Sequence, residues 1–128
     1  MKLNCILFYL VLLSFSSNAQ TSDMFIGKWQ FKDFYNSGVN DSAVINNSKK
    51  LYSKLNFTFY VDQHYISDFI GKDEGIWKYN AKTKRLSLIK KDGQEDFLNV
   101  ISLTDDKLVL SFPDNKGFIL EKLVTPDQ

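Results

Sequence analysis

The sequence predicts an all-β fold, an eight-stranded antiparallel up-and-down β-barrel. From residue 26 onward, apolar and polar residues alternate along almost every segment, which is typical of strands with one buried face. Turn-forming residues interrupt this alternation every 8 to 12 positions, and all connections but one are short enough for hairpins. Consecutive hairpins with one apolar face favour closure into a barrel, because closure leaves no unpaired edge. A β-sandwich is the alternative architecture.

The first four strands are expected at residues 26–35, 54–61, 64–69 and 75–79. In the first strand Gly27, Trp29, Phe31 and Tyr35 fall on one face, and the second alternates apolar with polar residues in the same way. Residues 62–63 form a tight connection, and residues 71–74 turn into the fourth strand. The third strand allows two phases, with either Tyr65, Ser67 and Phe69 or His64, Ile66, Asp68 and Ile70 facing inward.

The last four strands are expected at residues 85–90, 95–103, 107–112 and 118–123. Leucine residues alternate with other residues in the fifth and seventh strands, so these two have a clear apolar face. The connections at residues 91–93, 104–106 and 113–117 carry turn residues, and Gly117 stands where a type I turn with a bulge needs glycine. The sixth strand also allows two phases, with either Phe97 and Ile101 or Leu98 and Val100 facing inward.

The long connection at residues 36–53 differs from the others. It is rich in Asn, Ser and Lys, but it also carries the apolar residues Val44, Ile45, Leu51 and Tyr52. These residues are compatible with a short helix. Long loops in compact domains often serve as lids or binding loops, so we keep two interpretations open, a lid and a plain surface loop.

The first nineteen residues have the organisation of a signal peptide. Lys2 is followed by an apolar run at residues 6–13 and by Ser17-Asn18-Ala19, which suits cleavage after Ala19 or Gln20. The apolar run is too short to span a membrane; a buried N-terminal strand or helix is the alternative. The barrel domain is therefore expected at residues 20–128, and the mature protein to be secreted or periplasmic. Its basic and acidic residues are equal in number.

Composition excludes several classes of function. The chain of 128 residues carries 16 basic and 15 acidic residues, a balance that disfavours nucleic-acid binding. One cysteine and one histidine are too few for a disulfide framework, a cysteine zinc site or a histidine-rich metal centre. His64 lies near Asp62, but no nucleophile motif accompanies them. We therefore expect no catalytic residue, metal or cofactor, and no enzymatic activity.

The start of the first strand carries a G-x-W motif, Gly27-Lys28-Trp29, preceded by Phe25-Ile26. With the strand rhythm of residues 75–79 and 101–110, this motif resembles the calycin superfamily, which includes lipocalins and fatty-acid-binding proteins. Eight strands suit the small bacterial lipocalin-like domains best. In lipocalins a basic side chain near the end of the last strand packs across the motif tryptophan. The resemblance therefore implies that Lys122 covers Trp29, although the family usually has arginine there.

The alternating connections of such a barrel define two ends. We call the end where the first strand begins the closed end, and the end that carries residues 36–53 the open end. The aromatic residues of the inward faces are expected to line the open half and to contact a ligand. These candidates are Phe31, Tyr35, Phe57, Phe69, Phe97, Phe112 and Phe118, together with Leu55 and Leu88, and Trp77 is expected near the middle of the barrel.

The expected function is binding of a small apolar or amphipathic molecule without chemical change. The alternative is a protein-interaction module, envelope-associated or inhibitor-like, whose barrel is filled by its own side chains. The lysines expected at the mouth are mixed with carboxylates, so the mouth is not a basic funnel. A cavity of roughly 300 Å³ or more that opens at residues 36–53 favours the first hypothesis, whereas a filled interior favours the second.

Overall fold

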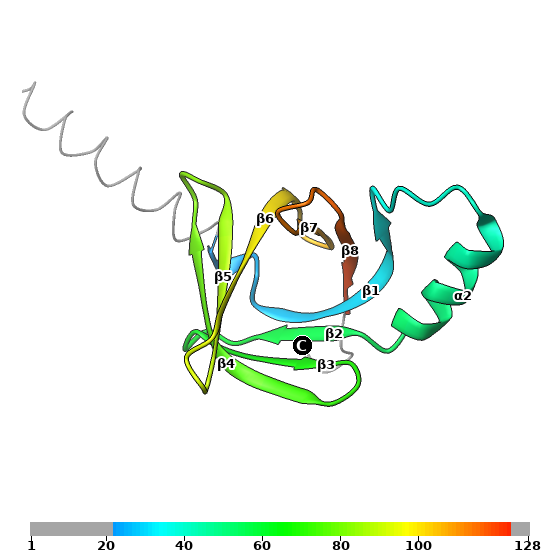
Figure 1. Ribbon diagram of the computed structural model, residues 1–128. Helices are drawn as coiled ribbons and strands as arrows, with labels where there is room; N and C mark the ends of the chain where they lie inside the picture. Colours follow the sequence, from blue (N-terminus) through cyan, green and yellow to red (C-terminus); the bar gives the residue numbers. More distant parts are fainter. Residues whose placement is uncertain (1–21, 124–128) are drawn as a thin grey trace, which may run out of the picture.

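The computed structural model describes residues 22–123, in which eight strands form one closed antiparallel barrel (Figure 1). Each strand pairs with the next along the chain, and β8 pairs with β1. The predicted fold class is therefore confirmed, and the sandwich alternative is wrong. The strands are β1 (Gly27–Tyr35), β2 (Asn56–Phe59), β3 (His64–Asp68), β4 (Lys72–Asn80), β5 (Arg85–Lys90), β6 (Glu95–Leu103), β7 (Lys107–Ser111) and β8 (Gly117–Lys122).

The expected leader, residues 1–19, lies outside the described residues. Within residues 22–123 we find no helix with the length and apolar character needed to cross a membrane.

The β3–β4 connection is tighter than predicted. Residues 72–74 were expected in a turn, but they already pair with residues 66–68 of β3. The turn itself is closed by a hydrogen bond from the Phe69 backbone N–H to the Gly71 carbonyl, at 3.3 Å. β4 is therefore longer than expected.

The long connection contains one helix, α2 (Ser42–Tyr52), as the apolar residues of this segment suggested. The Asp41 side chain caps its first turn by accepting hydrogen bonds from the backbone N–H groups of Ala43 and Val44. Figure 1 shows α2 at one side of the barrel, next to the end of β1 and the start of β2. The helix thus lies at the open end.

A β-bulge in β1 changes which side chains face inward. The register with β8 shifts between Phe31 and Asp33, so the alternation of side chains moves by one position. After the bulge Phe34 pairs with Phe118, and their rings lie 6.4 Å apart. Phe34 therefore continues the inner face of Phe31. The expectation that Tyr35 continues it is wrong.

The closed half of the barrel is filled by aromatic side chains. Phe25, which precedes β1, is fully buried, and its ring packs against the rings of Phe59, Trp77 and Tyr79 at 4.7–6.1 Å. Trp29 and most inward residues of the other strands join the same buried cluster. The centre of this barrel is therefore a packed core.

The closed end is sealed around Trp29. Its indole Nε1–H donates to the Phe25 carbonyl at 2.8 Å, and the Lys122 ammonium lies 5.1 Å from the centre of its ring. Lys122 Nζ also lies 3.4 Å from the Met24 carbonyl, which accepts its hydrogen bond. A side chain on Gly27 would come within 2.8 Å of the Lys122 stem, so glycine leaves room for this contact. Lys122 thus occupies the place that the resemblance implied.

Candidate binding site at the open end of the barrel

A cavity of about 310 Å³ lies between α2 and the rim of the barrel. Side chains of α2 form one wall, and the end of β1, the start of β8 and the β7–β8 turn form the other. The lining is mostly apolar and aromatic. From the helix and the loop before it come Ser37, Val39, Val44, Ile45, Ser48 and Tyr52; from the barrel come Phe34, Tyr35, Phe112, Lys116, Gly117 and Phe118.

Aromatic rings close the bottom of this cavity. Phe118 lies at their centre, with ring distances of 5.6 Å to Tyr52, 5.6 Å to Phe112 and 6.0 Å to Phe31. Tyr52 also stacks on Phe69 at 4.8 Å, almost parallel to it. Since Phe31 belongs to the buried core, these rings separate the cavity from the barrel interior. The cavity therefore lies above the core, at the rim.

Helix α2 is held mainly at its C-terminal end. The Tyr52 ring packs into the rim cluster, Lys49 forms an ion pair with Asp33 of β1 at 3.1 Å, and Gln30 Nε2 donates to the Ser53 carbonyl at 3.3 Å. No residue of the helix is buried. The N-terminal half of α2 consequently overhangs the cavity.

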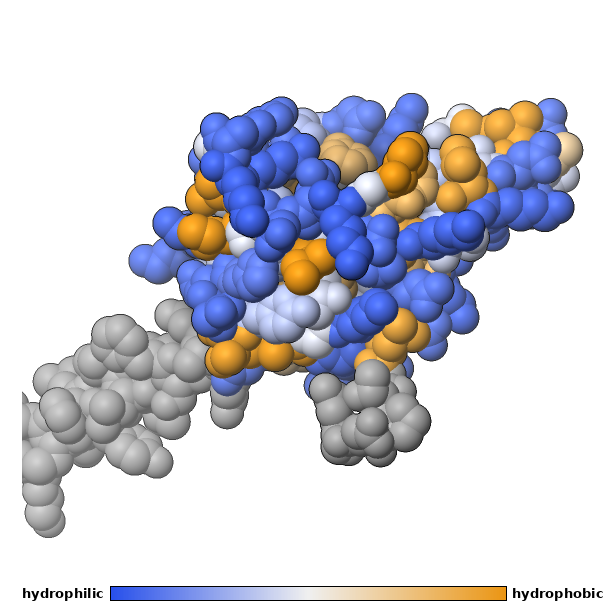
Figure 2. Space-filling view, turned by 90° about the horizontal axis from the view of Figure 1, so that it is seen from below, coloured by the Kyte–Doolittle hydropathy of each residue, from blue (hydrophilic) through white to orange (hydrophobic). Residues whose placement is uncertain are grey.

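Apolar side chains remain exposed around the cavity. Val39, Val44 and Phe112 line it, and all three are exposed. In the face shown in Figure 2, hydrophobic residues gather at the end that carries α2, set among hydrophilic ones. A molecule that fills the cavity would remove part of this apolar surface from water, which is favourable.

The structure brings some of the predicted ligand residues to the cavity and leaves others away from it. Tyr35, Phe112 and Phe118 line it, and Phe69 supports it through Tyr52. Phe31 lies beneath the cavity floor, and Phe57 is a core residue stacked 6.1 Å from Phe59.

The predicted inward position of Phe97 is wrong, and Trp77, although buried, lies away from the cavity. Phe97 faces outward with 46 % of its surface exposed, because it pairs with Ser87 on the outer wall while Leu98 and Val100 face the core. The guanidinium of Arg85 covers its ring at 5.3 Å. Trp77 lies in the closed half, where its Nε1–H donates to the Tyr60 carbonyl at 3.0 Å. Neither residue reaches the cavity.

Sequence reasoning missed Phe34 and the helix residues Val44, Ile45 and Tyr52 as cavity residues. The bulge hid Phe34, because a strict alternation places it on the outside. The other three were visible as apolar residues within a polar segment. Apolar residues within a long polar connection were therefore the sequence signal that could have identified these three positions.

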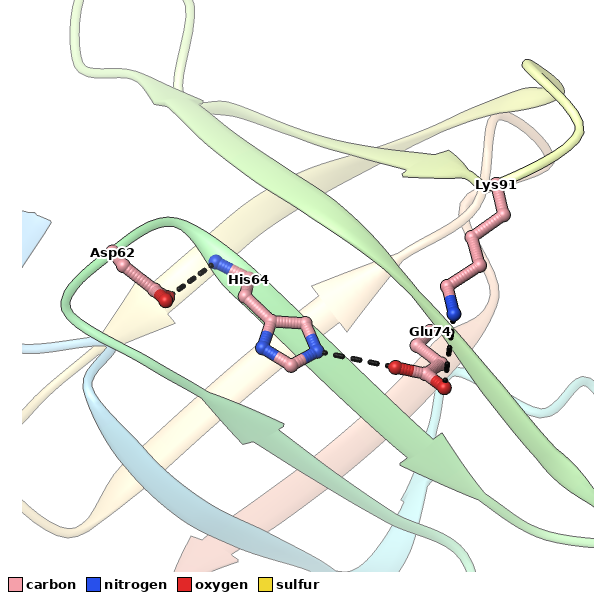
Figure 3. A network of polar contacts seen from close by, with 4 residues as sticks. All are labelled: Asp62, His64, Glu74 and Lys91. Carbon is pink, nitrogen blue, oxygen red and sulfur yellow. Dashed lines mark hydrogen bonds and ion pairs between the residues drawn. The ribbon is translucent and has the colours of Figure 1, made fainter.

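A polar network lies on the outer wall, on β3, β4 and the turn after β5 (Figure 3). Glu74 contacts His64 Nε2 at 3.4 Å and Lys91 Nζ at 3.2 Å, while Asp62 accepts from the His64 backbone N–H at 3.0 Å. Hydrogen bonds from Lys91 and then His64 lower the pKa of the Glu74 carboxyl. The side chains of His64, Glu74 and Lys91 are well exposed, so they form a surface network of polar contacts.

The pKa values of Tyr65, a core residue, and of the partly buried Tyr79 are raised. Burial raises the pKa of Tyr65, and the carboxylates of Asp73, Asp96 and Asp92 raise it further. Burial also raises the pKa of Tyr79. Both shifts favour the neutral phenol. Within residues 22–123, no three side chains of His, Cys, Asp or Glu are grouped so that they could hold a metal ion.

Comparison with known proteins identifies similar chains. A family model described as a lipocalin-like domain matches residues 25–110. A lipocalin-like protein of Bacteroides uniformis has a similar structure, with a TM-score of 0.59 and 14 % identity over 78 % of this chain and 99 % of that one. A DUF4847 family protein of Bacteroides vulgatus gives a TM-score of 0.56 and 14 % identity over 77 % and 93 %. No curated protein matches the chain.

Proposed function

The chain belongs to the lipocalin-like domain family, and on this premise we propose that it binds a small apolar or amphipathic molecule without changing it chemically. One observation carries the proposal, the cavity of about 310 Å³ between α2 and the barrel rim. Its volume lies at the lower end of the range for small-molecule sites, roughly 300–1,000 Å³. Its lining is apolar with a few polar groups, as such sites usually are.

The binding step is desolvation of an apolar surface. Val39, Val44 and Phe112 are exposed in the empty cavity, and a bound molecule would cover them. Each square ångström of apolar surface removed from water contributes about 25 cal/mol. Helix α2 supplies one wall, so residues 36–53 act as a cover over the open end. This is the lid interpretation of that segment.

The proposed site differs from the expected one. A ligand inside the barrel was expected, but the inward residues already fill that space with their own side chains. The ligand is therefore proposed to lie above the core, on the aromatic floor of Phe118, Phe34 and Tyr52. Removing aromatic residues deep in the barrel would affect folding more than binding.

The neutral fluorescent probe N-phenyl-1-naphthylamine tests this site. We expect Val44→Gln to weaken binding of the probe by roughly tenfold, because about 1.4 kcal/mol is lost when a polar amide replaces the valine that a bound probe would cover. Ile76→Gln is the matched control, since Ile76 is 50 % exposed against 49 % for Val44 but lies on the outer wall of β4. Absence of probe binding by the unmodified protein, or equal effects of both substitutions, would overturn the proposal.

A protein-interaction module is a second candidate, and the filled barrel interior favours it. The exposed residues Val39, Val44 and Phe112 would then contact a protein surface instead of a small molecule. Native mass spectrometry of the protein purified from its own host separates the candidates. A co-purifying small molecule that the probe displaces supports ligand binding. A protein complex without such a molecule, lost in Val44→Gln but not in Ile76→Gln, supports the second candidate.

We also propose that the protein is exported and acts in the periplasm or outside the cell. The proposal rests on the order of charged, apolar and small residues in residues 1–19. Expression of the full chain in its host, followed by cell fractionation and intact-mass measurement, tests it. We expect a mature chain that begins at Gln20 or Thr21 in the exported fraction. A chain that retains residues 1–19 in the cytoplasm would contradict export.

A further inference from the structure

We propose that the ligand of the rim cavity is a single-chain amphiphile with an anionic head group, and that Lys116 binds this head group. This inference rests on the proposed function, because it assigns a chemical class to the occupant of the same cavity. Lys116 is the one charged residue among the described residues that line the cavity, and no carboxylate lines it. The remaining lining is apolar, aromatic or uncharged polar.

The ammonium of Lys116 is free to bind an anion. Among residues 22–123 it forms no ion pair within 4.0 Å, whereas Lys49 on the neighbouring helix is already paired with Asp33 at 3.1 Å. Asp114, two residues before Lys116, accepts a hydrogen bond from the Lys116 backbone N–H at 3.1 Å. This hydrogen bond is made by the backbone of the turn and does not involve the Lys116 ammonium.

The surrounding backbone positions Lys116 at the edge of the cavity. The β7–β8 turn is closed by hydrogen bonds from Phe112 N–H to the Lys116 carbonyl at 2.8 Å and from Asn115 N–H to the Phe112 carbonyl at 2.9 Å. Asn36 Nδ2 ties the loop before α2 to this turn by donating to the Asn115 carbonyl at 2.9 Å. The Lys116 stem lies over Gly38, where a Cβ atom would be 3.5 Å from Cε and 3.7 Å from Nζ.

These contacts create a site with two chemically different parts. The aromatic floor can contact an alkyl chain. The ammonium at the edge can bind a negatively charged group while it remains outside the apolar part of the cavity. A cationic head group would be repelled by Lys116, and the lining offers no carboxylate to pair with the head group. Its transfer from water to this site is therefore unfavourable. A neutral head group would bind through its chain alone. The charge pattern therefore selects for an anion.

The cavity volume limits the length of the chain. The cavity of about 310 Å³ lies at the lower end of the range for small-molecule sites, roughly 300–1,000 Å³. This corresponds to a medium-length chain, and a longer chain would extend into solvent. Decanoate, 1-decanol and decylammonium are therefore suitable probes, because they share the chain and differ in head-group charge.

The experiment measures how well each of these three compounds displaces N-phenyl-1-naphthylamine at neutral pH. For the unmodified protein we expect decanoate to bind at least tenfold more tightly than decylammonium, and 1-decanol to fall between them. Lys116→Gln should remove the difference between decanoate and 1-decanol, and Lys116→Glu should favour decylammonium. Lys107→Gln, which removes an exposed lysine at the start of β7, is the control and should leave the order unchanged. High salt should reduce the preference, because it screens exposed charges.

The outcomes separate this inference from the proposed function. Equal binding of the three compounds, or an unchanged preference for decanoate in Lys116→Gln, overturns the assignment of an anionic head group. If the fluorescent probe still binds in that case, the proposed function remains intact. Failure of the probe and of all three compounds to bind overturns both. Unchanged probe affinity in Lys116→Gln and Lys116→Glu shows that the cavity is still formed in these variants.

Discussion

The two ends of the barrel use the same residue types for different purposes. At the closed end Phe25, Trp29 and Trp77 are almost completely buried, and both indole N–H groups donate to backbone carbonyls. At the open end Phe34, Tyr52 and Phe118 are also in ring contact, but each is only partly buried. Helix α2 covers them from one side and contributes no buried residue.

This difference shows that aromatic content alone does not distinguish a core from a binding site. At the closed end the residues before β1 and the stem of Lys122 complete the packing around the rings. At the open end α2 packs on the rings only through Tyr52 at its C-terminal end, and a cavity remains beneath the rest of the helix. We expect the closed end to dominate folding stability and the open end to dominate binding.

The largest expected effect is that of Trp29→Ala. Removing this fully buried ring should lower the free energy of unfolding by about 3–5 kcal/mol, the usual cost for a core aromatic residue. Phe118→Ala at the open end should cost less, about 1–3 kcal/mol, because its ring is only partly buried. Urea denaturation of both variants measures the two values. A larger loss for Phe118→Ala would contradict the division between the ends.

Two glycines provide the next test. Gly27 has φ +132°, and a Cβ atom there would lie 2.8 Å from Lys122 Cε. Gly27→Ala should therefore cost about 1–3 kcal/mol through backbone strain and displacement of Lys122. Gly38 has φ +71° and more space, so Gly38→Ala should cost about 1 kcal/mol. Thermal denaturation compares the two, and equal losses would show that the Lys122 contact contributes nothing.

The anchor of α2 should affect local rather than global stability. Tyr52→Ala removes the ring that packs on Phe34, Phe69 and Phe118, so the amides of α2 should exchange faster with solvent. The free energy of global unfolding should fall by only about 1 kcal/mol, since the ring is partly exposed. Tyr60→Ala, which removes an exposed tyrosine just after β2, is the control. Unchanged exchange in α2 would mean that other contacts hold the helix.

The smallest effect concerns Glu74, which belongs to neither end. Its pKa is lowered from 4.5, so the contacts of the Glu74 carboxylate with Lys91 and His64 favour folding above pH 4.5, and this stabilisation is lost as the pH falls through the lowered pKa. NMR titration of the Glu74 carboxyl should show this low pKa, and Lys91→Ala should raise it more than His64→Ala, because the Lys91 hydrogen bond is the larger cause. The change in global stability should be small, as for most exposed ion pairs. A Glu74 carboxyl that titrates with its ordinary pKa would contradict the contacts with Lys91 and His64.

Much of the fold follows from the residue pattern. Alternation and turn residues placed all eight strands, and the short connections required neighbouring strands to pair. The pairing of β1 with β8 then brings Trp29 opposite Lys122. These features are local or follow from closure, so they can be read from the sequence without knowing how side chains pack.

The binding site depends on information that the pattern does not contain. The bulge after Phe31 turns Phe34 inward, where strict alternation would place Tyr35. In β6, Leu98 faces inward and Phe97 faces outward. Pairing with the neighbouring strands sets both orientations. The side chains of all strands together decide whether the barrel centre is empty. Phe25, which precedes β1, also contributes its ring to this core. The cavity lies at the rim because Tyr52 and Lys49 hold α2 there. Their partners lie far away in the sequence, in β1, in the β3–β4 turn and in β8. Alternation therefore specifies the wall of the barrel, whereas long-range packing decides where space remains for a ligand.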